Sequence, residues 1–296
     1  YFKLDSLFSP SLLEIVLVPD NYPYVSLTWL IILSMVLLAI CLIDDLINLP
    51  VWVRLFAQIS CTTLMIQLGD MSIVNLGPIF GGEDIILHEY LAFLFTVFCV
   101  VGITNAYNWI DGIDGLFSLQ VSIAIIGISI LIGDFNFASI AFIAALLPYS
   151  IMNLGFLGNK FKVFIGDHGA MTIGFLLACN FVLATQSSFI EVRPVDALWC
   201  VGLVLLNAIQ VMWLRFKSNV SVFNSDRKHI HHLYLDLGFS NRETLLIVSL
   251  ISIAISSFGI TLMYFNVPEW ISLVLFLLML PLWSLLSYLM NKTKNL

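Results

Sequence analysis

Charged residues are scarce in this chain. Only 10% of its 296 residues are Asp, Glu, Lys or Arg, whereas 60% are hydrophobic. A soluble domain averages roughly 25% charged residues. The composition therefore excludes an ordinary soluble protein, and the long apolar runs predict an all-α polytopic membrane protein.

Basic residues and cysteine motifs are also in short supply. The net charge of −7 excludes a general nucleic-acid binder, which needs a basic surface. The five cysteines form no CxxC pair and no disulfide framework, so we expect buried thiols. Residue 1 is Tyr, and no cleavable signal peptide is visible. We therefore expect a single integral membrane domain, 1–296, that is incomplete at its N-terminus.

Nine apolar stretches are candidates for membrane-crossing helices, because a crossing needs about 20 largely apolar residues, with a range of roughly 17 to 25. Nine crossings place successive loops alternately on the two sides of a membrane. The stretches are 26–43, 51–68, 89–104, 115–132, 136–153, 169–185, 197–214, 244–265 and 269–290.

Lys and Arg are distributed unevenly between the two sides. Side one comprises 44–50, 105–114, 154–168, 215–243 and the tail from residue 291. Counting the adjacent Arg54, it holds all of the 12 Lys and Arg residues except Lys3 and Arg193. An excess of Lys and Arg marks cytoplasmic loops. We therefore expect side one to face the cytoplasm.

Six aspartates fall on this same side. A charged side chain in or near a bilayer is costly and is usually retained for a function. Carboxylates gathered at one membrane face indicate a hard cation and phosphate chemistry. The six are Asp44, Asp45, Asp111, Asp114, Asp167 and Asp226.

Asp44 and Asp45 are adjacent at the end of an apolar stretch. Neighbouring residues on a helix point about 100° apart, so the two carboxylates cannot form one bidentate clamp. They can serve two separate roles. The alternative is that two acids simply mark the exit from the membrane.

The segment NAYNWIDGIDGL, residues 105–116, is the most specific of the motifs. Asp111 and Asp114 are three residues apart, so a helical turn would place them on the same side. Asn105 and Asn108 repeat the spacing with neutral oxygen ligands. Magnesium commonly binds through one or two carboxylates plus substrate phosphates. A plain Gly/Asn/Asp turn between helices is the alternative.

The sequence GDHG at 166–169 opens the next apolar stretch and follows the basic residues Lys160 and Lys162. Phosphate binds well at helix N-termini, so Asp167 suits a metal ligand beside a phosphate. A plain N-cap is the alternative.

A basic histidine cluster lies in the cytoplasmic loop 215–243. Arg227 can bind phosphate oxygens, and histidines can donate to them or shuttle protons. His229 and His232 are three apart and could share a face, with His231 between them. Zinc binding and a solvated polar loop are alternatives, although no cysteine is near.

With these motifs, the chain resembles the polyprenyl-phosphate N-acetylhexosamine-1-phosphate transferase superfamily. The matching pieces are DD at 44–45, NAYNWIDGIDGL at 105–116, KVFIGDHG at 162–169 and SDRKHIHHL at 225–233, in the family's order. The HIHH form is most similar to the bacterial undecaprenyl-phosphate GlcNAc-1-phosphate branch. The resemblance implies about eleven helices, of which this chain holds about nine, and cytoplasmic active-site loops.

The resemblance also implies a reaction. A UDP-N-acetylhexosamine, most simply UDP-GlcNAc, would donate its sugar 1-phosphate to undecaprenyl phosphate, releasing UMP and initiating cell-surface polysaccharide such as the O-antigen of lipopolysaccharide. The cofactor would be Mg²⁺, with Mn²⁺ as an alternative. The enzyme would be multi-pass in the bacterial cytoplasmic (inner) membrane, surrounded by membrane lipids, with its active site on the cytoplasmic face. Its oligomeric state stays open, a homodimer included.

The same resemblance assigns roles to individual residues. In these roles Asp44 or Asp45 engages the lipid phosphate, with action as a base left open, and the 111/114 pair organises the nucleotide site. The implied assignments are catalysis by Asp44, Asp45, Asp111 and Asp114, metal binding by Asn108 and Asp167, and substrate binding by Asn105, Lys162, Arg227, His229, His231 and His232.

Two positions depart from the family pattern. Ala170 lacks the hydroxyl usual after the GD motif, and Asn207 stands where the branch usually has Asp. A weakened or inactive relative that binds lipid phosphate or a UDP-sugar is therefore the alternative. A transporter would place polar groups near the midplane, often in repeats, and a CDP-alcohol phosphotransferase would need an arginine soon after its first DG. The sequence shows neither feature.

Overall fold

The computed structural model describes residues 24–135, 137–186, 192–219 and 229–294, and this part of the chain is all-α, as the sequence predicts. It contains no strand, only an isolated antiparallel bridge between Asn75 and Ile86. The helices are α2 (Tyr24–Ile47), α3 (Val51–Gly69), α4 (Glu89–Ile110), α5 (Leu116–Ile132), α6 (Phe137–Asn153), the 3-10 helix η2 (Asn159–Phe161), α7 (Gly166–Gln186), α8 (Pro194–Cys200), α9 (Gly202–Lys217), α10 (Ile230–Asp236), α11 (Asn241–Tyr264) and α12 (Glu269–Lys294).

The helices have the length and composition of a multi-pass membrane protein. Six of those described are long and apolar enough to cross a membrane, and α8 with α9 would make a seventh if the bent pair is one span. Two further apolar helices, Leu116–Ile132 and Ser139–Asn153, are shorter. All nine predicted stretches are helical in whole or in large part, whereas their number of crossings stays a prediction.

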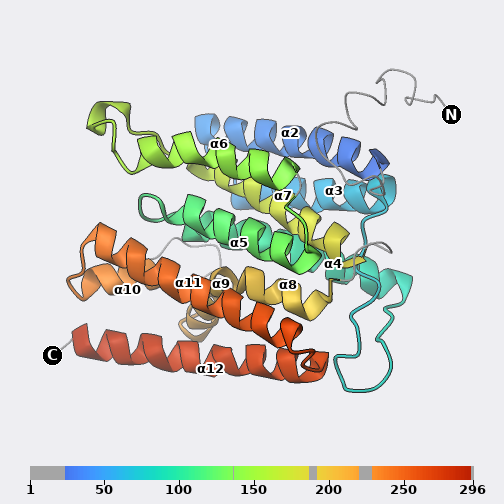
Figure 1. Ribbon diagram of the computed structural model, residues 1–296. Coiled ribbons are helices and arrows are strands. Elements are labelled where there is room, and N and C mark those ends of the chain that lie inside the picture. The colour runs from blue at the N-terminus through green and yellow to red at the C-terminus, as the bar shows by residue number, and fades with distance from the viewer. Residues whose placement is uncertain (1–23, 136, 187–191, 220–228, 295–296) are drawn as a thin grey trace.

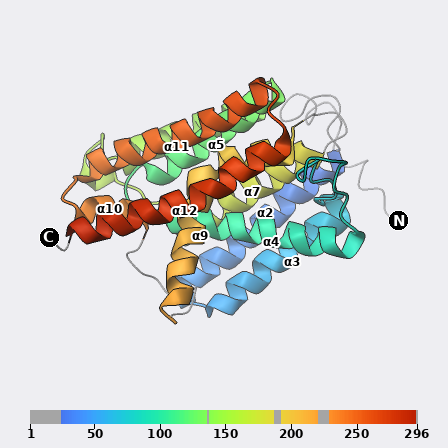
Figure 2. The same cartoon turned by 90° about the horizontal axis from the view of Figure 1, so that it is seen from below.

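The expectation of one continuous helix over 197–214 is wrong. The axes of α8 and α9 differ by 82°. Val201 lies between them with φ −109° and ψ 14°, which is the bridge region and not the helical one. Figure 2 shows that α9 runs across the direction of the long helices α11 and α12.

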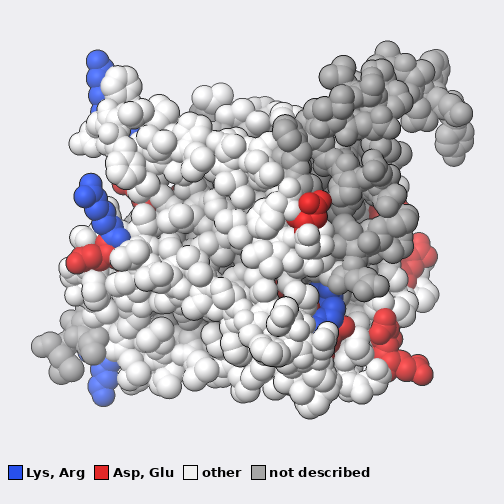
Figure 3. Space-filling model, viewed as in Figure 1, with Lys and Arg blue, Asp and Glu red and all other residues white. Residues whose placement is uncertain are grey.

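The long helices run side by side, so the loops gather at two ends of the bundle (Figure 1). The residues after α2, the α4–α5 turn, the α6–α7 connection and α10 lie at one end, which we call the α10 end. These are the segments that the sequence places on one side. On the face shown in Figure 3, Lys and Arg lie mainly at the α10 end, and Asp and Glu prevail at the other.

Helices α4 and α7 form the centre of the bundle. One buried cluster combines residues of α2, α3, α4 and α7, and a second combines residues of all the α-helices from α4 to α12. Gly174 of α7 permits the close approach of α4, because a Cβ there would lie 3.1 Å from the Cα and O atoms of Thr104. The two central helices therefore connect both cores and fix the relative positions of the loops that follow them.

Packing of α11 on α8 provides a test of the fold. A Cβ at Gly259 would lie 2.1 Å from Cβ and Cγ of the buried Trp199. Gly259→Ala should therefore lower stability by about 1–3 kcal/mol through overpacking, measured as thermal unfolding in detergent micelles. Gly102→Ala is the matched control, since nothing lies within 4 Å of its added Cβ. Equal melting temperatures for the two variants would contradict this packing.

Candidate active site

Arg54 links the ends of three helices. It lies in the first turn of α3, so the short connection from α2 brings it beside Asp44. Its Nη1 is 3.2 Å from Oδ2 of Asp44 and donates to Oδ2 of Asp167 at 2.9 Å. The Asp44 side chain is only 8% exposed, whereas that of Asp167, in the first turn of α7, is 52% exposed. The cation thus stabilises one buried carboxylate and leaves the other accessible.

Asp45 has a different partner from its neighbour. Its Oδ2 contacts Nδ1 of His168, in the first turn of α7. The two adjacent acids therefore have different partners, and their predicted separate roles stay a prediction. About a third of the Asp45 and His168 side chains is exposed, so this pair faces the surroundings more than Asp44 does.

Asp111 and Asp114 lie in the turn between α4 and α5, and the expected helical turn across them is wrong. Helix α4 ends at Ile110, and Gly115 has φ 79°, a left-handed conformation that glycine adopts readily and that does not continue a helix. Asp114 accepts a hydrogen bond from Nζ of Lys162 at 2.5 Å. The connection between α4 and α5 is thus a Gly/Asn/Asp turn, the alternative to a helical turn, and Asp111 and Asp114 both lie in it.

Among the described residues, Asp111 has no cationic partner. Burial and, to a smaller extent, the carboxylates of Asp167 and Asp114 together raise its pKa to about 6. Within the described ranges it has neither a hydrogen bond nor an ion pair, and the amide of Asn108, one turn earlier on α4, has no hydrogen bond either. Oxygen atoms without partners beside other carboxylates indicate a place for a cation.

The asparagine that precedes them has protein partners. Nδ2 of Asn105 donates to Oε1 of Gln58 at 2.6 Å and to the carbonyl of Val101 at 2.8 Å. Asn105 therefore packs α4 against α3, and its predicted contact with substrate stays a prediction.

The histidine cluster contacts the acidic turn directly. A Cβ at Gly112 would lie 1.9 Å from Nε2 of His231, so only glycine leaves room for that ring. The rings of His229 and His231 are parallel with centroids 5.7 Å apart, and those of His231 and His232 are 4.3 Å apart. Glycine at 112 therefore allows the α4–α5 turn and α10 to meet.

His231 is buried with both ring nitrogens lacking a hydrogen-bond partner among the described residues. Burial lowers its pKa to about 3, and the neighbouring rings of His232 and His229 act in the same direction. Unpartnered buried nitrogens are costly, which indicates a polar ligand at this point. Asp226, Arg227 and Lys228 lie outside the described residues.

The acidic residues fit a magnesium ion better than zinc. Among the described residues, four of the five aspartates of these motifs pair with the two permanent cations Arg54 and Lys162 or with His168, and Asp111 pairs with none of them. No group of three or more His, Cys, Asp or Glu side chains in the described ranges is placed to hold a metal. Magnesium prefers one or two carboxylates completed by water and phosphate. Asp167 and Asn108 offer such oxygen atoms, and the excess negative charge favours a divalent cation.

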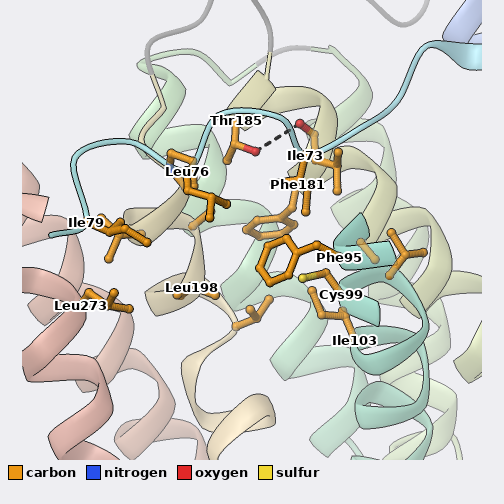
Figure 4. A pocket seen from close by; sticks show the side chains of 17 residues that line it. Ile73, Leu76, Ile79, Phe95, Cys99, Ile103, Phe181, Thr185, Leu198 and Leu273 are labelled. Atoms are coloured by element: carbon orange, nitrogen blue, oxygen red, sulfur yellow. Dashed lines mark hydrogen bonds between the residues drawn. The ribbon is translucent and has the colours of Figure 1, made fainter. Parts of the chain in front are cut away.

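A separate cavity of about 180 Å³ lies away from these polar groups. Figure 4 shows Phe95 of α4 and Phe181 of α7 inside it, with Leu76 of the α3–α4 loop and Leu198 of α8. Thr185 is the one polar residue in its wall, and its hydroxyl donates to the carbonyl of Val182 at 3.2 Å. The cavity therefore offers no groups for phosphate chemistry.

Sequence reasoning missed several residues of the site. The sequence analysis used Arg54 only to orient the chain in the membrane. Arg54 and Gln58 are four residues apart, so both polar side chains lie on one face of α3, and this spacing was a signal that could have revealed them. His168 carried no assigned role. Asn153 was also missed: its Oδ1 accepts from the Gly115 amide at 2.6 Å and its Nδ2 donates to the carbonyl of Val163 at 2.8 Å. No periodicity could have revealed that last link, because it joins two irregular segments.

Comparison with known proteins gives consistent matches. A family model described as Glycosyl transferase family 4 matches residues 27–185, more than half of the chain. A protein from Escherichia coli K12 named undecaprenyl-phosphate alpha-N-acetylglucosaminyl 1-phosphate transferase is 37% identical over 249 residues, covering 82% of this chain and 68% of the relative. Proteins of the same name from Salmonella typhimurium LT2 (35% over 266 residues, 88% and 72%) and Pasteurella multocida Pm70 (36% over 255 residues, 84% and 71%) are also similar.

The Arg54 ion pairs lead to a stability prediction. Arg54→Ala leaves Asp44 buried without its cation, which should cost about 3 kcal/mol in thermal unfolding in detergent. Adding Asp44→Asn should recover at least half of that loss, because the uncompensated charge is removed. Lys160→Ala, an exposed basic residue of the same end, is the control. If the double variant is no more stable than the single one, the charge of Asp44 is not what Arg54 stabilises.

Proposed function

This chain belongs to glycosyl transferase family 4, and from that membership together with the site we propose that it transfers N-acetylglucosamine 1-phosphate from UDP-GlcNAc to undecaprenyl phosphate. The products would be UMP and an undecaprenyl-linked diphosphate sugar, which initiates cell-surface polysaccharide. The relatives' names supply the acceptor and the sugar phosphate. The nucleotide donor and the downstream pathway are part of our proposal.

One observation carries this proposal above the others. Four motifs that are distant in sequence are joined by direct contacts at the α10 end. Asp44 and Asp167 share Arg54, Asp114 pairs with Lys162, and Gly112 adjoins His231. Separate solvated loops would give no reason for this convergence, whereas a site for two phosphate substrates requires it.

The proposed chemistry is a displacement at phosphorus. An oxygen of the lipid phosphate forms a bond to the sugar-bearing phosphorus of the UDP-sugar. The bond from that phosphorus to the oxygen bridging the two phosphates breaks, and UMP leaves with this oxygen. Such transfers depend mainly on positioning and on stabilisation of negative charge.

We propose that Asp167 and Asn108 hold Mg²⁺ (Mn²⁺ is the alternative), with Asp111 nearby. The ion would neutralise charge on the diphosphate when bound. Arg54 would hold the Asp167 carboxylate in a fixed orientation from the side opposite the substrate. Lys162 and the histidines of α10 would contribute donors to phosphate or sugar oxygens.

Asp45 is the better candidate of the adjacent pair for contact with the lipid phosphate. Asp44 is buried and held by Arg54, whereas Asp45 is about a third exposed and, among the described residues, pairs only with His168. A carboxylate beside an imidazole can accept a proton from an incoming phosphate and pass it on. The Lys and Arg excess at this end supports a cytoplasmic orientation in the bacterial inner membrane.

A direct assay tests the proposal. Membranes carrying the full-length protein are incubated with radiolabelled UDP-GlcNAc, undecaprenyl phosphate and Mg²⁺, and lipid-linked product and UMP are measured together. We expect both in equal amounts, and loss of both with EDTA. Absence of product with UDP-GlcNAc, UDP-GalNAc and other UDP-HexNAc donors alike would favour a relative that only binds these ligands.

Asp167→Asn tests the metal site within that assay. Removing the charge of a metal-binding oxygen should lower turnover by about 10²- to 10³-fold and raise the Mg²⁺ concentration needed for half-maximal rate. Asp70→Asn, an exposed aspartate after α3 at the other end, is the matched control and should behave as wild type. Unchanged Mg²⁺ dependence in Asp167→Asn would remove this residue from the metal site.

A further inference from the structure

Asn207 of α9 makes two hydrogen bonds to the start of α10. Its Oδ1 accepts from the backbone N–H of Ile230 at 2.9 Å, and its Nδ2 lies 3.1 Å from Nδ1 of His229. Asn207 is 1% exposed and His229 is 6% exposed. Buried polar groups of this kind are held in one arrangement by their partners.

The backbone amide of Ile230 fixes the orientation of the Asn207 side chain. A backbone N–H can only donate, so the carboxamide oxygen must face Ile230. The NH₂ group therefore faces His229, and because it too can only donate, Nδ1 of His229 must accept. A neutral imidazole that accepts at Nδ1 carries its proton on Nε2. A doubly protonated ring would set an N–H against the Asn207 NH₂ group.

We propose that Asn207 is a positioning residue that fixes His229 as the tautomer with its proton on Nε2. His229 then contributes a hydrogen-bond donor to the site and does not act as a proton acceptor. The rings of Trp109, His231 and His232 surround it at centroid distances of 6.4, 5.7 and 6.5 Å. The tautomer follows from geometry alone, whereas its use toward a phosphate oxygen rests on the proposed function.

One near-isosteric substitution reverses the arrangement. In Asn207→Asp, carboxylate oxygens would accept both from the Ile230 amide and from a proton on Nδ1 of His229. The proton should therefore move from Nε2 to Nδ1, or both nitrogens should carry one. Full-length protein labelled with ¹⁵N-histidine in detergent micelles reports this directly, since long-range proton–nitrogen couplings identify the protonated nitrogen. His229→Gln assigns the signals by subtraction.

Each outcome decides the question. A wild-type proton on Nε2 that relocates in Asn207→Asp is the expected result. A wild-type proton on Nδ1, or no change in the variant, overturns the proposal. Asn241→Asp, an exposed asparagine in the first turn of α11, makes the same charge change and should leave the pattern unaltered. If Asn207→Asp does not fold, Asn207→Ala serves instead and should give a mixture of tautomers.

The turnover assay then separates this proposal from the proposed function. Asn207→Ala, which leaves the His229 tautomer unfixed, should lower kcat by up to about 10²-fold if the donor on His229 meets negative charge in the transition state, with an Asn241→Ala control unaffected. The NMR measurement needs no substrate. Protein without any transferase activity but with the expected tautomer would refute the function and leave the role of Asn207 intact.

Discussion

The placement of one guanidinium group governs much of this structure. A charge at the margin of an apolar bundle is costly unless it is paired, and Arg54 pairs two carboxylates from different helices at once. The ends of α2, α3 and α7 are thereby held together. Because α7 also packs closely against α4, the same arrangement positions the turn that follows α4. The acidic site depends on this sequence of contacts.

The site combines compensated and uncompensated charge. Asp44, Asp45 and Asp114 have cationic or imidazole partners, whereas Asp111 has none in the described part of the chain and its pKa is raised. The histidine cluster shows the same division, since His229 is held by Asn207 and the nitrogens of His231 have no partner among the residues that the structure describes. Protein contacts therefore hold the framework, and the remaining groups are the ones to which we assign the proposed ligands.

Sequence reasoning recovered the helices and the common end of the polar motifs because both depend on strong local signals. The length of an apolar run predicts a helix, and the uneven distribution of Lys and Arg assigns each loop to one of the two sides of the membrane. It failed where tertiary contacts decide. The break at Val201 carries no proline, and the turn at Asp111 contradicts a spacing rule that holds only inside a helix. Arg54 and Asn153 act through long-range contacts that no local pattern contains.

Gly112 shows how a residue without functional groups can matter at a site. It contributes space, since a methyl group at this position would overlap with Nε2 of His231. The α4–α5 turn and α10, which are far apart in sequence, thus pack so closely that the space between them does not admit one more carbon atom. Among variants of such a protein, position 112 should be as restricted as the aspartates beside it, although it has no chemistry to lose.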